Sequence, residues 1–209
     1  MRKQLLILFA LLLGLVTPMA AQKNFKVDPR VKLAKQKYTE RASYVLTMKE
    51  YEKDGIPSLN YTTVVRKQNW SGSGQMIDSM TFYYQEEYVD DTEPYPSGYT
   101  LTIMCRAYNI GSGEYFEQYI YDDEGNPLLW YSHYGYFDGK GYINQFELQG
   151  CYAANGDLLE TTCKKAEEDG ELKDCELEEA FERAFDSAKK NFPLFKKVFN
   201  ELYGVEYSY

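Results

Sequence analysis

The chain of 209 residues is short of the side chains that build metal centres. It contains one histidine, and none of its four cysteines belongs to a Cys-x-x-Cys pair. A multi-histidine metal site and a zinc ribbon are therefore excluded, since both need several such ligands at close spacing. We expect the protein to bind no metal and no cofactor.

Positive charge is also scarce, with 23 lysines and arginines against 32 aspartates and glutamates and a formal net charge of −9. An acidic surface repels the phosphates of nucleic acids, so we expect no nucleic-acid partner. The hydrophobic fraction of 44% is nevertheless too high for a disordered chain. The composition predicts a folded protein that would attract basic rather than acidic partners.

Long apolar runs are absent except near the start of the chain. Leu5–Val16 is an apolar run that follows Arg2 and Lys3, and it is too short to span a bilayer. Small residues up to Ala21 then end the run, which is the pattern of a secretory signal peptide. We predict a signal peptide over residues 1–21, cleavage near Ala21, a periplasmic or secreted location, and no transmembrane segment in the mature chain.

The remaining residues, 22–209, are predicted to fold as a single α+β domain. Asp28 and Pro29 open a helix, because aspartate caps a helix well and proline suits its first turn. Near the C-terminus, Asp174 and Pro193 are placed to open two further helices with apolar residues at helical spacing. Between the helices we expect one antiparallel β-meander sheet of about six to seven strands.

Regularly spaced turn motifs support the meander. Asparagine or aspartate followed by glycine is the strongest local signal for a hairpin, because both turn residues must accept positive φ. Such motifs recur after residue 99, separated by segments of strand length. The predicted turns are Gly111-Ser112-Gly113, Asp123-Glu124-Gly125-Asn126, Asp138-Gly139-Lys140-Gly141, Asn155-Gly156 and Asp169-Gly170.

Two stretches, YIYDDEGNPLLWYS and YAANGDLLETT, place an acidic or asparagine-containing glycine turn between two strand-like segments. They resemble the tyrosine-rich hairpin units of MORN-like meander repeats, and also many exported bacterial proteins of unknown function. The resemblance covers the chain from about Tyr115 to Thr162. It implies consecutive hairpins and assigns no functional residue.

The turn positions fix the register of neighbouring strands, and the register decides which side chains share a face. A four-residue loop at Ile110–Gly113 places Arg106 opposite Glu117 and Tyr108 opposite Tyr115. The opposite charges of Arg106 and Glu117 support this register, because such cross-strand pairs are stabilising.

The following turns extend the pairing to the next strands. The turn at 123–126 places Tyr119 opposite Trp130, and a four-residue loop at 138–141 places His133 opposite Phe146. We therefore expect one face of the sheet to form the core and to pack against a helix. That predicted core face consists of Ile103, Phe116, Ile120, Leu129, Tyr131, Phe146 and Leu148.

The opposite face is rich in tyrosine, and the strand beyond it would add Gln145, Glu147 and Gln149, so we expect solvent there. Large aromatic side chains with polar tips suit recognition of sugars or of a protein surface. The predicted binding surface, called here the aromatic face, consists of Arg106, Tyr108, Tyr115, Glu117, Tyr119, Tyr121, Trp130, Tyr134 and Tyr136. The C-terminal helices could instead cover these residues as a second small core.

Other groups of polar residues are less specific indications of a catalytic or metal-binding site. Glu117 and Glu147 would flank Ser132 on strands about 9.6 Å apart, close to the carboxyl separation of about 6.5–9.5 Å in inverting glycosidases. His133 is expected to be a hydrogen-bonded core histidine rather than a general base. The acidic segment Asp122–Asn126 offers oxygen ligands to calcium, although a hairpin turn explains it equally well.

In an oxidising compartment the four cysteines permit disulfides. The register places Cys163 near Leu148 on the core face and Cys151 opposite Glu160 on the other face, which disfavours a bond between those two cysteines. A bond from Cys163 to Cys175 would tie the last strand to the first C-terminal helix. We predict this Cys163–Cys175 disulfide.

The sequence thus predicts an exported, non-enzymatic binding module that uses its aromatic face to bind a protein or a glycan. Two alternatives remain open. One is a hydrolase acting on glycans through Glu117 and Glu147, and the other is a structural envelope protein without a ligand.

Overall fold

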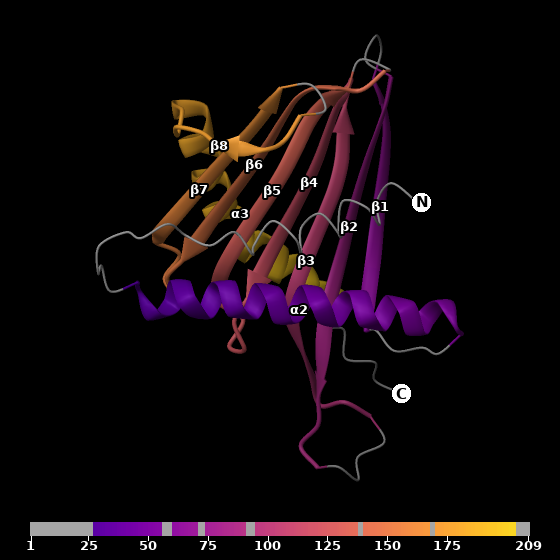
Figure 1. The fold of residues 1–209 in the computed structure, drawn as a ribbon. Coiled ribbons are helices and arrows are strands. Elements are labelled where there is room, and N and C mark those ends of the chain that lie inside the picture. The colour runs from indigo at the N-terminus through magenta and orange to yellow at the C-terminus, as the bar shows by residue number, and fades with distance from the viewer. Residues whose placement is uncertain are drawn as a thin grey trace.

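The computed structural model describes residues 27–55, 60–70, 74–90, 95–137, 140–167 and 170–203. The predicted signal peptide lies outside this part of the chain. The described residues form one antiparallel sheet of eight strands in chain order, with a helix on each face (Figure 1). The elements are α2 (Pro29–Lys53), β1 (Tyr61–Trp70), β2 (Gly74–Glu87), β3 (Gly98–Ile110), β4 (Gly113–Tyr121), β5 (Pro127–Phe137), β6 (Tyr142–Tyr152), β7 (Leu158–Glu167), β8 (Lys173–Asp174) and α3 (Glu179–Tyr203).

The structure confirms the α+β class with a single antiparallel sheet and corrects two of the predicted counts. The sheet has eight strands, because the short strand β8, which contains Asp174, pairs with β7 instead of opening a helix. The C-terminal region forms the single helix α3, with Pro193 inside it. The buried positions of α3 continue on both sides of Pro193. Their burial compensates for the backbone hydrogen bond that a proline inside a helix removes.

Helix α2 packs against one face of the sheet. Its buried side chains recur at helical spacing, which gives the helix one apolar side. The core that they form with the sheet consists of Val31, Ala34, Tyr38, Val45, Tyr83, Ile103, Ile120, Leu128, Leu129, Tyr131 and Cys151. Arg30 on α2 also donates a hydrogen bond of 3.0 Å to Asp122 in the β4–β5 turn, which fixes the helix at that end of the sheet.

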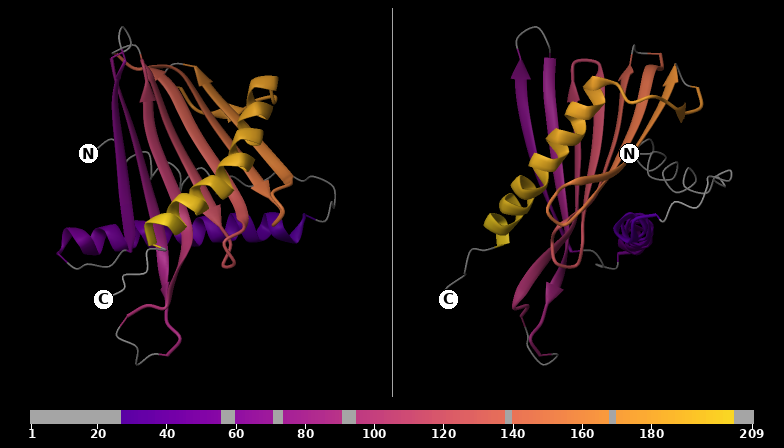
Figure 2. Two further views of the ribbon diagram at one scale, coloured as in Figure 1. Left: turned by 180° about the vertical axis from the view of Figure 1, so that it is seen from behind. Right: turned by 90° about the vertical axis from the view of Figure 1, so that its left-hand side faces the viewer.

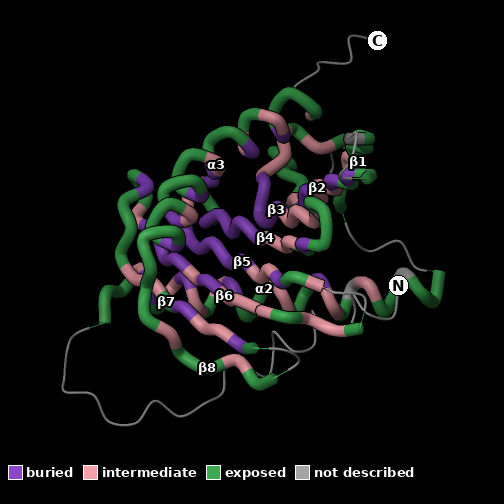
Figure 3. The backbone as a smooth tube through the Cα atoms, turned by 90° about the horizontal axis from the view of Figure 1, so that it is seen from above, coloured by how far each residue is buried: buried purple, intermediate pink, exposed green. Residues whose placement is uncertain are grey.

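Helix α3 crosses the opposite face on a diagonal, from β6 and β7 near its start to β2 and β3 near its end (Figure 2). Its phenylalanines pack against aromatic side chains of the sheet. The paired rings are Phe181 with Phe146, Phe185 with Trp130, Phe192 with Tyr119, and Phe199 with Phe82. Figure 3 shows buried residues concentrated in the strands beneath this helix. Because α3 runs diagonally, part of this face lies beyond its edge.

The strand register from β3 to β5 agrees with the prediction. Arg106 lies opposite Glu117, and Tyr119 lies opposite Trp130. The register between β5 and β6 differs by one residue, since His133 lies opposite Glu147. An irregularity between Tyr136 and Phe137 shifts the pairing there. Such a bulge adds one residue to one strand and so changes every pair that follows.

This one-residue slip reverses the two faces of β6, because neighbouring side chains of a strand point to opposite sides. Phe146 and Leu148 therefore pack on the α3 side, and the prediction that they belong to the same face as Tyr131 is wrong. Glu147 instead lies on the α2 side, where it accepts a hydrogen bond from Tyr131. The strand next to the tyrosines thus presents apolar groups, which favours its burial beneath a helix.

A disulfide joins Cys163 in β7 to Cys175 in the segment before α3, with the two Cα atoms 5.4 Å apart. This is the disulfide that we predicted from the strand register. Cys105 and Cys151 are free thiols. Burial raises the pKa of each to about 11, so both stay protonated near neutral pH. No helix among the described residues is long and apolar enough to cross a bilayer.

Replacing Cys163 and Cys175 together by serine should lower the free energy of unfolding by about 3 kcal/mol, because the short loop that the bond closes would gain freedom in the unfolded chain. Urea unfolding of the oxidised wild type and the double variant measures this difference. Cys105→Ser keeps the disulfide and serves as the control. An unchanged unfolding midpoint in the double variant would show that the bond does not stabilise the fold.

Candidate ligand-binding surface

The nine residues of the aromatic face lie on the side of the sheet that faces α3, and the helix divides them into two groups. Tyr119, Tyr121 and Trp130 lie beneath α3 and are at most 2% exposed. The prediction that these three side chains contact solvent is therefore wrong. The second group is half-buried or exposed and consists of Arg106, Tyr108, Tyr115, Glu117, Tyr134 and Tyr136.

The covered group has a structural role. The Tyr119 ring lies 5.1 Å from that of Phe192, and the Tyr121 hydroxyl donates a hydrogen bond of 2.9 Å to the carbonyl oxygen of Phe192. The Trp130 indole meets Phe185 edge to face, and its buried N–H has no hydrogen-bond partner among the described residues. These contacts seal the three rings away from any ligand in solution.

Four aromatic side chains from adjacent strands form a stack that we call the aromatic ladder, which starts at Phe146 against Phe181 of α3 and leads away from the helix to Tyr108. Its members are Tyr108 on β3, Tyr115 on β4, Tyr134 on β5 and Phe146 on β6. Successive ring centroids are 4.7, 5.9 and 4.9 Å apart, and the ring planes differ by 4°, 16° and 17°. Because the rings stack on one another, they present mainly their edges and hydroxyl groups to a ligand.

A cation lies over the ring at each end of the ladder. The Arg106 guanidinium carbon lies 4.3 Å from the Tyr108 ring centroid, and the Lys165 Nζ atom lies 5.6 Å from that of Phe146. Such cation–π contacts are favourable and hold the terminal rings in place. The ladder is therefore a preorganised surface rather than a set of independent side chains.

Several ladder hydroxyls are available to a ligand. Tyr136, next to the ladder on β5, is 43% exposed. Within the described part of the chain, the hydroxyls of Tyr108 and Tyr134 have no hydrogen-bond partner and are not buried. Burial of the rings raises the pKa of both hydroxyls, so they stay protonated and can donate as well as accept.

A buried ion pair supports the charged end of the ladder. The Asp78 carboxylate is 2% exposed and accepts two hydrogen bonds of 2.9 Å from Arg106. Arg66 donates a third hydrogen bond of 3.1 Å to it. The hydrogen bonds from Arg106 are the main cause that lowers the pKa of Asp78, so this carboxylate is charged at neutral pH.

Glu117 connects this ion pair to helix α3. Burial raises its pKa, while Arg106 at 3.9 Å acts in the opposite direction. Glu117 accepts a hydrogen bond of 3.1 Å from the Tyr119 hydroxyl, which in turn accepts one of 3.1 Å from Asn191 on α3. This network connects the ladder to the covered core. The position of the ladder therefore depends on α3.

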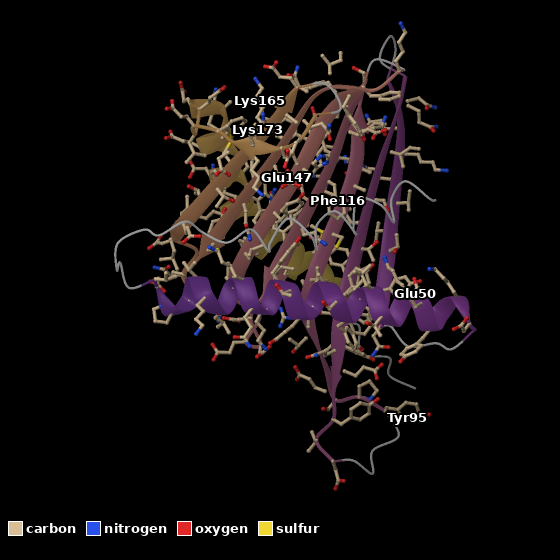
Figure 4. All side chains as sticks on the ribbon, viewed as in Figure 1. Glu50, Tyr95, Phe116, Glu147, Lys165 and Lys173 are labelled. Carbon is tan, nitrogen blue, oxygen red and sulfur yellow. A yellow bond between two sulfur atoms is a disulfide. The ribbon has the colours of Figure 1, made fainter. Side chains whose placement is uncertain are left out.

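The structure does not bring together the carboxylates of the alternative hydrolase. Glu117 faces α3, whereas Glu147 lies above α2 on the other side of the sheet, where Figure 4 labels it. Two carboxylates separated by a sheet cannot flank one glycosidic bond. His133 lies opposite Glu147, and burial lowers its pKa, so the imidazole is neutral at pH 7.

The α2 side holds a polar cluster that the sequence reasoning missed. Tyr131 donates a hydrogen bond of 2.9 Å to Glu147, and the Gln118 amide nitrogen lies 3.6 Å from the Cys105 sulfur. The hydroxyl of Tyr38 and the amide oxygen of Gln118 are buried without a hydrogen-bond partner in the described residues. Only the correct β6 register, which places Glu147 on this side, would have indicated the cluster.

The acidic turn after β4 has a structural explanation. The Asp122 carboxylate accepts hydrogen bonds from the backbone nitrogens of Glu124 and Asn126, at 3.0 and 2.7 Å, and from Arg30. Its oxygens are therefore occupied within the turn. In the described ranges of the chain, no three histidine, cysteine, aspartate or glutamate side chains gather as a possible metal site.

No protein-family model, curated protein or solved structure matches this chain. Residues 115–162 form consecutive antiparallel hairpins in the structure.

Proposed function

We propose that this chain is an exported, non-enzymatic binding module, located in the periplasm or secreted, and that the uncovered part of the aromatic face is its binding surface. The observation that carries the proposal is the aromatic ladder, in which three half-buried tyrosines stack ring on ring with Phe146, which itself packs against α3. The signal-like residues 1–21 support export.

The chemistry of the ladder favours a glycan as the ligand. The ring faces are used within the stack, so the groups left for a ligand are ring edges and hydroxyls. A glycan carries many hydroxyls, and each can donate to and accept from a tyrosine hydroxyl. A ladder across four strands also suits an extended chain, since it spans about 14 Å at the usual strand spacing.

Rigidity supports the same proposal. Tyrosine loses little conformational freedom on binding, because it has two side-chain torsions. The cation at each end and the stacking between rings reduce that freedom further before a ligand arrives. A preorganised surface loses less free energy on binding than a mobile one.

Removing one ladder hydroxyl at a time tests the proposal. Tyr108→Phe and Tyr134→Phe keep the ring stack and should each weaken glycan binding by about three- to tenfold, the effect of one lost hydrogen bond. The wild type would first be screened on an array of neutral oligosaccharides and polysaccharides. Calorimetric titration with the best ligand would then compare the variants.

Tyr44→Phe and Tyr51→Phe, on exposed positions of α2, are the matched controls and should leave affinity unchanged. Failure of the wild type to bind any glycan on the array would contradict the glycan assignment. Equal affinity of the wild type and the Tyr108→Phe/Tyr134→Phe double variant would show that the ligand binds elsewhere.

A further inference from the structure

The two edges of the sheet differ in length. At one edge, β8 has two residues, and a very short edge strand is one way in which proteins limit pairing with other chains. At the other edge, β1 runs for ten residues without a proline and without an irregularity in its pairing with β2. Within the described ranges, β1 pairs with β2 alone. Its outer edge is therefore a template for a further strand.

The pairing with β2 fixes which backbone groups of β1 point outward. The Tyr84 N–H donates a hydrogen bond of 3.1 Å to the carbonyl oxygen of Asn60, and in an antiparallel pair such bonds recur at every second residue. Even-numbered residues of β1 are thus bonded to β2. The Ile77 N–H agrees, since Ile77 lies opposite Lys67 and donates to Asn109 on the other side of β2. The residues whose backbone groups point outward are Tyr61, Thr63, Val65, Lys67 and Asn69.

The outer edge of β1 is accessible while the strand itself is held in place. Helices α2 and α3 lie on the two faces of the sheet and not along this edge (Figures 1 and 2). The side chains of Tyr61 and Val65 are 43% and 51% exposed. On the α3 side, the hydroxyl of Thr62 forms a hydrogen bond with that of Tyr203 at the end of α3. A strand held in this way can accept another strand without a change of fold.

Strand β1 is complementary to a second copy of itself. A two-fold axis perpendicular to the sheet places two β1 strands antiparallel. Because opposite residues of an antiparallel pair share a face, the axis must pass through a residue and not between two residues. With the axis at Val65, every outward-pointing residue has a partner in the other copy, whereas an axis at Val64 leaves Asn69 beyond the pairing. The pairs about Val65 are Val65 with Val65, Thr63 with Lys67, and Tyr61 with Asn69.

The charges of β1 favour the same axis. The strand carries the positive side chains of Arg66 and Lys67 and no acidic residue. An axis at Arg66 would place two guanidinium groups opposite each other, and an axis at Lys67 two ammonium groups, which is destabilising. The axis at Val65 instead places Arg66 opposite Val64 and Lys67 opposite Thr63. It also packs two exposed valine side chains against each other.

We propose that the outer edge of β1 pairs antiparallel with β1 of a second copy of this chain, with the two-fold axis at Val65. The two eight-stranded sheets then form one continuous sheet. The contact closes as a dimer, because each copy uses the same edge and the other edge ends in β8. One strand from each copy is a small interface, so the dimer is weak and reversible. This proposal is independent of glycan binding by the aromatic ladder.

Sedimentation velocity of the mature chain over a range of concentrations tests the proposal. The wild type should dimerise, and the dimer should persist or tighten between about 50 and 500 mM salt, because salt screens the repulsion between two acidic copies. Val65→Pro should weaken dimerisation at least about tenfold, because it removes the N–H group at the axis. The fold should tolerate this proline, since the N–H group faces away from β2.

Two charge variants test the position of the axis. Val65→Lys and Val65→Glu should each weaken self-association about fivefold or more, because like charges then lie directly opposite each other. An equimolar mixture of the two variants should form a mixed dimer that is tighter than either variant alone, since lysine then lies opposite glutamate. Ile143→Lys and Ile143→Glu, at a 48% exposed position of β6, are the matched controls and should dimerise like the wild type, alone or mixed.

A wild type that sediments as a monomer up to about 1 mM at both salt concentrations would overturn the proposal, even if the edge of β1 bound a strand of a different protein. A dimer that Val65→Pro leaves unchanged would overturn it too, because its contact would lie elsewhere. A mixture of the charge variants that associates no more tightly than each variant alone would exclude an axis at Val65. Circular dichroism of each variant shows that a loss of dimer does not come from unfolding.

Discussion

Replacing Phe192 by alanine should lower the free energy of unfolding by about 3–5 kcal/mol, the usual loss for a large aromatic side chain in a close-packed core. Phe192 is fully buried and lies where α3 meets three tyrosines of the sheet. Its ring lies 5.1 Å from that of Tyr119 and 5.3 Å from those of Tyr121 and Tyr152.

Urea unfolding at neutral pH measures this effect. Leu194→Ala, at a 51% exposed position of the same helix, is the matched control and should change stability by less than about 0.5 kcal/mol. Equal stabilities of the two variants would mean that α3 does not seal the aromatic face.

Replacing Arg106 by methionine should lower the free energy of unfolding by about 3 kcal/mol or more, because it leaves the Asp78 carboxylate buried with a single exposed partner. Arg106 donates both of its short hydrogen bonds to Asp78, whereas Arg66, with 57% of its side chain exposed, donates one. Arg66→Met is therefore the matched control, with an expected loss below about 1 kcal/mol.

The pH dependence of the Arg106→Met effect identifies its cause. The wild-type Asp78 has a pKa below its usual range, so its pairing is complete above the unfolded pKa and is lost as the pH falls through the folded value. In the variant, burial would favour the protonated acid. The stability difference should therefore narrow below about pH 4. A difference that stays constant down to pH 3 would point to lost packing instead of an unpaired charge.

Local signals were sufficient to predict much of the fold. The Asp28-Pro29 start and the helical spacing after it gave the N-terminal helix, and the turn glycines gave the register from β3 to β5. The disulfide followed from the pairing of β6 with β7, in which Leu148 lies opposite Cys163.

The predictions about the face of β6 and the exposure of Trp130 were wrong for one main reason. The bulge at Tyr136 and Phe137 has no signal in the sequence that distinguishes it from a regular four-residue turn, yet it exchanges the faces of β6. The polar row expected beside the tyrosines is replaced by Phe146 and Leu148. The apolar row gives α3 a surface to cover, and Trp130 becomes part of a core.

The prediction of two C-terminal helices in place of the single helix α3 was also wrong. Proline is common at the first turn of a helix, so Pro193 indicated a new helix after a break. The continuous helix can be recognised only once its partner is known, because the buried positions Phe185, Phe192 and Phe199 form one stripe that matches the aromatic residues of the sheet. The predicted register correctly placed Tyr108 opposite Tyr115 and Tyr115 opposite Tyr134, whereas the boundary between covered and uncovered residues depends on this tertiary packing.

Helix α3 divides the aromatic face into a sealed part and an accessible part, and we propose that the accessible part binds ligand. Hydroxyl-radical footprinting read by mass spectrometry, with and without a bound glycan, tests it most directly. We predict oxidation at Tyr136 and on the uncovered edge of the ladder, reduced by the glycan, and little oxidation at Tyr121 and Trp130 in either state. Rapid oxidation of Trp130 in the folded protein, or an unchanged pattern at Tyr136 when the glycan binds, would contradict the account.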